Sequence, residues 1–208
     1  MNRRGLLAVI AAAATAAGGC VADEGPTDDQ STGQSTDEAV VEQFDTGPDR
    51  PECEKESEII EVEQAGETYE YETAATVPYP PEPESFDEET ITSFVEEFDN
   101  AYVRHDVLCR RRSGEILNVS HSVEETVTLD WQDEISHFLI FRAAGASAGL
   151  DDSGAMWEAG IGYSGVVYAI DETGVARAEF EDAAMLEPDQ REDQAPDPLE
   201  NGYLVAEF

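Results

Sequence analysis

Cysteine and histidine are the residues of this sequence whose spacing points most directly to chemistry. Cys53 and Cys109 form an even pair once Cys20, discussed below, is set aside. In an exported chain such a pair favours a disulfide, which would tie residue 53 to the end of a predicted helix. Closing a loop of this size contributes about 4 kcal/mol to stability in the chain-entropy description. We therefore expect a Cys53–Cys109 disulfide.

A metal site is the alternative use of the same residues. His105 and Cys109 are four positions apart, so a helix would place them on one face, and Cys53 could supply a third ligand for zinc or copper. The sequence offers no identifiable fourth ligand, and oxidising surroundings favour a disulfide over free thiolates. The sequence thus predicts a disulfide, with no resident metal and no cofactor.

Two further motifs suggest catalysis or ion binding, but each lacks a required part. Gly145-Ala146-Ser147-Ala148-Gly149 has the spacing of a nucleophile elbow, yet all three histidines precede Ser147, whereas that fold places the histidine after the serine. Asp151-Asp152-Ser153-Gly154 offers oxygen ligands for calcium without the spaced third carboxylate and final glutamate of a calcium loop. We name no catalytic residue, and the sequence favours a protein that is not an enzyme.

Asn118 and a run of arginines are the remaining candidate sites. Asn118-Val119-Ser120 matches the acceptor pattern for N-glycosylation, and we expect it on an exposed segment. Arg110-Arg111-Arg112 could bind phosphate or carboxylate through guanidinium groups. Cations in the last turn of a helix also complement the helix dipole and pair with nearby acids, and we favour this structural interpretation.

Cys20 ends an N-terminal segment that is typical of export. Arg3-Arg4 precede an uncharged apolar run, Leu6–Ala17, which is too short to span a bilayer. This start resembles a twin-arginine signal, and Ala17-Gly18-Gly19-Cys20 resembles a lipobox. We expect residues 1–19 to be a signal peptide and Cys20 to carry a two-chain lipid, which suffices for lasting attachment. The expected location is the extracellular face of the cell membrane.

The charge of the chain indicates the solvent to which it is adapted. Its 208 residues include 48 acidic and 11 basic side chains, for a formal net charge of −37. This balance excludes a nucleic-acid binder, which needs a cationic surface to contact phosphates. Repulsion at this density destabilises a compact domain in dilute buffer, whereas a Debye length of about 3 Å in 1 M salt suppresses it. Because the acids are dispersed along the chain, we favour halophilic adaptation over a cation buffer or a nucleic-acid mimic.

Beyond the signal, composition divides the chain into a stalk and one domain. Residues 20–57 are rich in acidic and small polar residues, with Val40, Val41 and Phe44 as the only substantial apolar cluster. This segment predicts an acidic, disordered stalk, because it buries too little apolar surface to offset the entropy of ordering it. Residues 58–208 contain enough apolar side chains for a single core.

Periodicity predicts an α+β fold for this domain, with one principal amphipathic helix packed on an antiparallel sheet. Apolar residues recur at helical spacing from Ile91 to Leu108, after a possible capping box at Ser85. Alternating or apolar runs predict strands, and we expect a long irregular loop over residues 182–201. The expected strands cover residues 59–63, 68–73, 123–131, 137–144, 161–170, 175–180 and 203–208.

The order of one aromatic-striped helix followed by consecutive strands resembles the cystatin-like and NTF2-like folds. The twin arginines, the lipobox, the acidic stalk, the Phe94–Tyr102 helix and the Tyr168–Arg177 hairpin together resemble secreted lipoproteins of haloarchaea. That resemblance implies a surface location and no known activity. The NTF2-like resemblance implies a pocket between helix and sheet, although no catalytic residue of that family can be matched here.

Two functional hypotheses follow from these observations. The first is a lipid-anchored, extracellular, non-catalytic binding or structural module, with the membrane as one partner and an envelope protein or a small ligand as the other. The alternative is an NTF2-like pocket protein, a small-molecule binder or an enzyme. Its cavity would be lined by aromatic side chains, namely Trp131, Trp157, Tyr163 and Tyr168.

Overall fold

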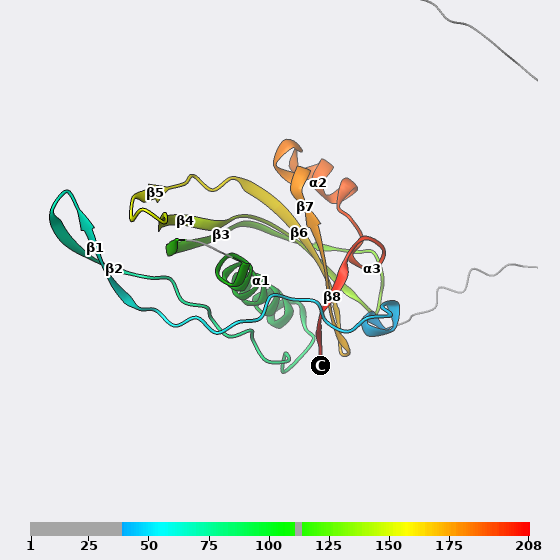
Figure 1. The fold of residues 1–208 in the computed structure, drawn as a ribbon. Coiled ribbons are helices and arrows are strands. Elements are labelled where there is room, and N and C mark those ends of the chain that lie inside the picture. Colours follow the sequence, from blue (N-terminus) through cyan, green and yellow to red (C-terminus); the bar gives the residue numbers. More distant parts are fainter. Residues whose placement is uncertain (1–38, 111–113) are drawn as a thin grey trace, which may run out of the picture. The chain divides into compact units, whose positions relative to one another are not determined.

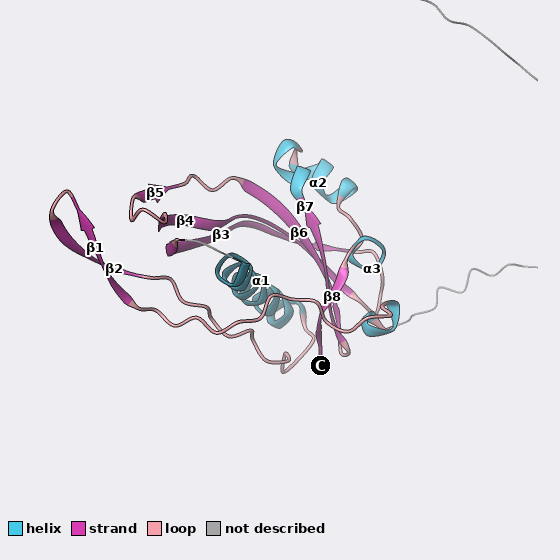
Figure 2. Ribbon diagram, viewed as in Figure 1, coloured by secondary structure: helices cyan, strands magenta, loops and turns pink. Residues whose placement is uncertain are grey.

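The computed structural model describes residues 39–110 and 114–208, which belong to one compact unit (Figures 1 and 2). The expected signal peptide and Cys20 lie outside the described residues. Along the chain the elements are η1 (Val40–Gln43), β1 (Ile59–Gln64), β2 (Glu67–Glu72), α1 (Glu88–Arg110), β3 (Glu115–Leu129), β4 (Ser136–Leu150), β5 (Met156–Glu158), β6 (Tyr163–Asp171), β7 (Gly174–Phe180), η2 (Glu181–Met185), α2 (Pro188–Gln194), α3 (Pro198–Asn201) and β8 (Tyr203–Glu207).

The large sheet is an antiparallel meander. Its strands pair in the order β3-β4-β6-β7-β8, and the short β5 pairs with β4. Strands β3 and β4 are each 15 residues long and form one hairpin, in which Leu129 lies opposite His137. The pairing register shifts at points along β3, such as between Val123 and Glu125. The α+β prediction is confirmed.

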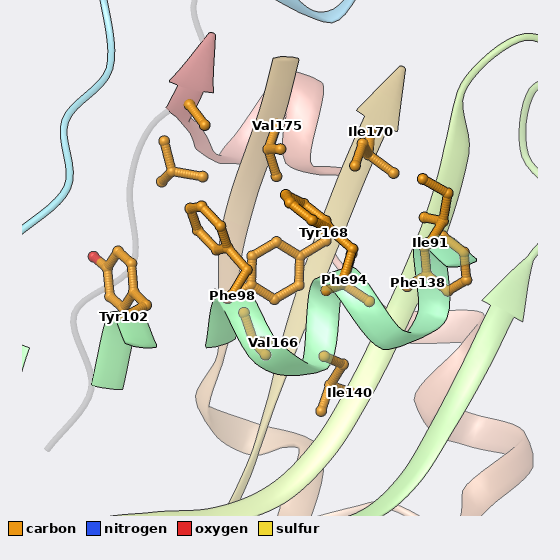
Figure 3. Close-up of a cluster of buried hydrophobic side chains, with 13 residues drawn as sticks. Ile91, Phe94, Phe98, Tyr102, Phe138, Ile140, Val166, Tyr168, Ile170 and Val175 are labelled. Carbon is orange, nitrogen blue, oxygen red and sulfur yellow. The ribbon is translucent and has the colours of Figure 1, made fainter. Parts of the chain in front are cut away.

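Helix α1 lies across one face of this sheet (Figure 1). Residues three and four apart on α1 fall on one side, and this side is buried against the strands. Figure 3 shows Ile91, Phe94, Phe98 and Tyr102 of α1 with Phe138, Ile140, Val166, Tyr168, Ile170 and Val175 of the sheet. Among the described residues, no helix combines the length and the apolar content that crossing a bilayer requires.

Asp87 stabilises the first turn of α1. Its carboxylate accepts a hydrogen bond from the Thr90 N–H at 3.0 Å, as expected for an acid before a helix N-terminus. Hydrogen bonds from Ser85 and Thr90 lower the pKa of Asp87 to about 2. Ser85 therefore acts through Asp87, rather than as the cap that the sequence suggested.

The opposite face of the sheet is also covered, in part by the segment predicted to be an irregular loop. That prediction is wrong, because residues 182–201 contain most of η2 and the short helices α2 and α3. Pro188 and Pro198 occupy first helical positions, where a missing N–H costs nothing, and Asp197 caps α3 by accepting from the Leu199 N–H. A core on this face contains Leu129, Leu139, Phe141, Val167, Phe180 and Ala183.

Residues 39–57, which we call the strap, lie on the domain rather than in the stalk. Val40 is fully buried, and its N–H donates to Asp171 Oδ2 at 2.8 Å. Further along, the Asp49 N–H donates to the Leu204 carbonyl, and Cys53 is bonded to Cys109. The expected boundary at residue 57 therefore differs from the structure. The apolar cluster that begins at Val40 is buried beside the sheet, in a core with Ile135, Ala169, Ala176 and Leu204. This burial offsets the entropy that the segment loses when it becomes ordered.

Strands β1 and β2 form a separate two-stranded sheet that projects from the rest of the fold (Figure 1). Its two-residue loop, Ala65-Gly66, has positive φ at both positions, as a tight hairpin turn of this twist requires. Gln64 links the hairpin to the turn between β4 and β5, since its Nε2 donates to the Gly154 carbonyl at 2.9 Å.

The strap predicts a measurable contribution of Val40 to stability. Val40→Ala removes two methyl groups from a closed core and should lower the free energy of unfolding by about 2 kcal/mol. The half-buried neighbour Val41 is the matched control, and Val41→Ala should lower it by less than half as much. Urea denaturation in molar KCl measures both variants. Equal small losses would show that the strap does not contribute to the folded core.

Candidate functional site

Asp99 of α1 is a fully buried acid that contacts four strands of the sheet. The Nε2–H of His121 on β3 donates to Asp99 Oδ2 at 2.8 Å, and the Nε–H of Arg142 on β4 donates to the same oxygen. The Tyr168 hydroxyl on β6 donates to Oδ1 at 2.8 Å, and the Arg177 guanidinium on β7 lies 3.8 Å from Oδ1. We call these five residues the Asp99 network.

Arg177 extends the network toward β8. Its side chain is buried, its Nε–H donates to the Tyr168 hydroxyl at 3.0 Å, and one terminal nitrogen donates to Glu179 at 2.5 Å and to the Tyr203 hydroxyl at 3.1 Å. The guanidinium carbon lies 4.0 Å from the centre of the Tyr102 ring, a cation–π contact. Arg142 and Arg177 thus both lie beside the buried carboxylate of Asp99. Arg177 also pairs with the carboxylate of Glu179 at the edge of the network.

The protonation states within the network follow from its contacts. Burial by itself raises the pKa of Asp99, because a carboxylate loses hydration. The hydrogen bond from His121 and the charges of Arg142 and Arg177 outweigh burial and hold the pKa of Asp99 well below its usual range. Burial and the adjacent Asp99 charge raise the pKa of Tyr168 well above its ordinary value. Asp99 is therefore ionised, and the Tyr168 hydroxyl keeps the proton that it donates.

His121 is the network member that reaches a hollow at the surface. Its side chain is 11% exposed, and the hollow of about 300 Å³ is lined by Ser93, Glu96, Glu97, Asn100, His121 and Val123. A histidine oriented by a carboxylate can act as a general base toward a substrate in such a hollow. Here the Asp99 carboxylate also accepts from Arg142 and Tyr168 and lies beside the Arg177 guanidinium. This arrangement holds the imidazole in place and fits a structural role.

Cys53 and Cys109 are joined by a disulfide, with their Cα atoms 5.8 Å apart. The bond connects the strap to the last turn of α1. His105, one helical turn before Cys109, points its Nδ1 toward the sulfurs, at 3.9 Å from Cys109 Sγ. The structure thus brings together all three residues that the sequence allowed for either a disulfide or a metal site. In this oxidised state the sulfurs are not available as thiolate ligands.

Ser147 lies within β4 and not at a strand-to-helix turn. Its hydroxyl oxygen accepts hydrogen bonds from Asn118 Nδ2 at 2.6 Å and from the Ser120 hydroxyl at 2.9 Å. The elbow geometry that would activate this serine is therefore missing from β4. Asn118 is exposed on β3, but its amide nitrogen is engaged with Ser147, so a glycan attached there would replace this contact.

Asp151 forms a hydrogen-bonded turn. One oxygen of its carboxylate accepts from the Ser153 N–H at 2.8 Å, from the Ser153 hydroxyl at 2.7 Å and from the Ala155 N–H at 3.0 Å. This pattern is an Asx turn, which explains the residue types at 151–154 without an ion.

The four aromatic residues proposed to line a cavity lie apart. Tyr168 is in the core beneath α1, while Tyr163 is half exposed on β6 and stacks on Phe141, with ring centres 5.3 Å apart. Trp131 follows β3 and packs near His137, at 5.1 Å between ring centres. Trp157 is on β5, beside a smaller core at the end of α1. No single cavity in the described residues is lined by these four side chains.

Three buried charges carry the network, and sequence analysis missed them. The sequence around each of these charges nevertheless indicated that it is buried. Asp99 is four residues after Val95 and three before Tyr102, which places it inside the apolar face of the helix. Arg142 follows the apolar run Phe138–Phe141, and Arg177 lies between alanines in a strand. A charge within an apolar pattern indicates a buried partner of opposite sign, because unpaired buried charges are costly.

His137 has the one buried side-chain polar atom in the described residues without a hydrogen-bond partner, its Nε2. The Nδ1–H donates to the Ile135 carbonyl at 3.0 Å. Burial lowers the pKa of His137, so the ring is neutral at pH 7. His137 lies on the face of the sheet opposite α1 and takes no part in the Asp99 network.

Comparison with known proteins gives no relative to guide the assignment. No protein-family model matches the chain, and searches of curated proteins and of solved structures found no significant match.

The Asp99 network predicts a large effect of a small substitution. Asp99→Asn keeps the shape of the side chain but leaves Arg142 and Arg177 buried without their central counter-charge. We expect the free energy of unfolding at pH 7 to fall by about 3 to 5 kcal/mol. Because the pKa of Asp99 is lowered by folding, the difference should be fully present above about pH 4 and should shrink as the pH falls below that value. Urea denaturation in molar KCl between pH 3 and pH 7 measures it.

Asp106, on the same helix, is the matched control. Its side chain is 37% exposed and pairs with Arg110 at 2.9 Å. Asp106→Asn should lower the free energy of unfolding by less than about 1 kcal/mol, because exposed ion pairs contribute little. Similar losses in the two variants would contradict a special role for Asp99.

Proposed function

We propose that this chain is a lipid-anchored surface protein of a halophile, and that its folded part is a non-catalytic binding or structural module. The observation that carries the proposal is the packed interface of α1 with β4, β6, β7 and β8. Aromatic and aliphatic side chains occupy most of that interface (Figure 3), and the Asp99 network occupies the remainder. Protein groups, rather than a ligand, satisfy the buried charges.

The attachment to the membrane rests on the sequence. Arg3-Arg4, the apolar run and Cys20 have the order of an exported lipoprotein signal. The strap supports this proposal, because a chain tethered at its N-terminal side needs a firm junction with the domain. Burial of Val40 and the Cys53–Cys109 bond fix the two ends of this junction.

Halophilic adaptation is supported by where the charges lie. Among the buried residues of the described part, Asp99 is the one acid. The other described acids are half-buried or exposed, so their mutual repulsion is open to screening by salt. A local example is Glu61, which lies directly opposite Glu70 in the β1–β2 hairpin, a destabilising pairing of like charges.

One observation favours the alternative of a pocket protein. His121, oriented by Asp99, borders the hollow between α1 and β3. The NTF2-like alternative would use this hollow, rather than the cavity first expected, for a small molecule. A metabolite that stays bound through purification in high salt, detected by native mass spectrometry, would support this alternative.

The anchor is tested by substitution of its cysteine. Cys20→Ser should move the protein from the membrane fraction into the medium of the native host, because it removes the thiol to which the lipid is attached. The Cys53→Ser/Cys109→Ser double variant is the control and should stay with the membrane. Retention of Cys20→Ser at the membrane to the same extent as the unaltered chain would refute the lipid anchor.

Salt dependence tests the proposed adaptation. The free energy of unfolding should rise from dilute buffer to molar KCl, since a shorter Debye length weakens repulsion among the acids. Glu70→Gln removes one member of the facing pair and should make the β1–β2 hairpin less dependent on salt, as seen by hydrogen exchange of its amides. An unfolding midpoint that is equally high in dilute buffer would contradict halophilic adaptation.

A further inference from the structure

Cys53, His105 and Cys109 form a corner of the fold in which an imidazole lies beside the disulfide. A disulfide alone does not require such a neighbour. The two sulfurs and one ring nitrogen of His105 all lie within 4.8 Å of one another. His105 is 7% exposed, and its ring stacks on Tyr79, with centres 4.7 Å apart. The histidine is thus fixed beside the sulfurs by packing.

Hydrogen bonds also fix which nitrogen of His105 carries the proton. Nε2 lies 2.9 Å from the Val77 carbonyl, which can only accept, so Nε2 carries the hydrogen. The Cys53 N–H donates to Nδ1 at 3.4 Å, so Nδ1 presents a lone pair on the side of the sulfurs. A ring N–H donated to a backbone carbonyl, with the other nitrogen facing the sulfurs, is the arrangement found in metal-ligating histidines, and Nδ1 becomes free to bind when Cys53 moves and its N–H releases the lone pair.

We propose that reduction of the Cys53–Cys109 disulfide converts this corner into a zinc site, with both thiolates and His105 Nδ1 as ligands. Two sulfurs and one imidazole are ligands that suit Zn²⁺, and a set of three protein ligands leaves one coordination position open. The proposal does not depend on the lipid anchor. It concerns the reduced state of the Cys53–Cys109 pair that connects the strap to α1.

The conversion balances as a two-electron step. A dithiol reductant transfers two electrons and two protons, the sulfur–sulfur bond breaks to give two thiols, and the reductant becomes a disulfide. Zn²⁺ then displaces the two thiol protons and forms two zinc–sulfur bonds. Thiolates on one tetrahedral zinc lie about 3.7 Å apart, so one cysteine must move. Cys53 can do so, because it lies on the extended strap, whereas Cys109 is held within α1.

The surroundings leave room for the ion. Cys53 and His105 border an open hollow of about 610 Å³, which is also lined by Glu52, Glu54 and Glu56. Water or one of these carboxylates can take the fourth position. The same acids also bind zinc weakly and non-specifically. The experiment must separate this background binding from binding at the site.

The test uses the full chain in molar KCl. The protein is reduced with a dithiol, the reductant is removed under argon, and Zn²⁺ binding is measured by competition with a chromophoric chelator. The oxidised chain is the internal control, because it keeps every surface acid and Cys20 but has no free thiol at Cys53 or Cys109. We expect one tight equivalent of zinc in the reduced chain only. Co²⁺ in its place should give thiolate-to-metal charge-transfer absorption.

Two variants make the assignment specific. Cys53→Ser should abolish the tight equivalent, and His105→Gln should weaken it at least about tenfold. Asp106→Asn, on the same helical turn, should leave it unchanged. If the reduced chain loses structure, Zn²⁺ should restore the far-ultraviolet circular dichroism of the unaltered chain but not that of Cys53→Ser. Equal zinc binding by the oxidised and reduced chains, or by His105→Gln and the unaltered chain, would overturn the proposal.

Discussion

The position of α1 on the sheet depends on the carboxylate of Asp99. An apolar helix face can slide or rotate on an apolar sheet at little expense, because hydrophobic contact is not directional. Hydrogen bonds are directional, and Asp99 accepts them from β3, β4 and β6 and forms an ion pair with Arg177 of β7. One side chain therefore sets the register of the helix against four strands. The network adds specificity to a core whose stability comes from aromatic and aliphatic packing.

The sheet carries layers on both faces, and the chain builds them from distant segments. Helix α1 covers one face, while the strap, η2, α2 and α3 cover parts of the other. Strand β8 joins the two sides, since Val205 belongs to the core beneath α1 and Leu204 to the core beneath Val40. With both faces covered, the middle strands read as apolar runs in the sequence, and these runs include the buried Arg142 and Arg177.

The fold could be predicted where the sequence pattern is regular. The residues of the candidate site are exceptions to that pattern and were missed. The spacing from Ile91 to Leu108 predicts α1, and alternating or apolar runs predict most of the strands of the large sheet. Composition misplaced the start of the domain, because three apolar residues in an acidic segment looked too few to pack. Composition also predicted a loop where α2 and α3 lie, because this segment is rich in proline and acidic residues. In the structure these residues start and cap the two helices. Asp99, Arg142 and Arg177 were missed because single charges were treated as interruptions of an apolar pattern.

The order of the elements along the chain has a consequence in time. During synthesis α1 emerges before any strand of the large sheet, and an amphipathic helix takes most of its stability from tertiary packing. Its buried face stays exposed until β4, β6 and β7 have followed. Strand β8, which completes both cores, comes after α3. Both of these cores can therefore be completed only after β8 has been synthesised.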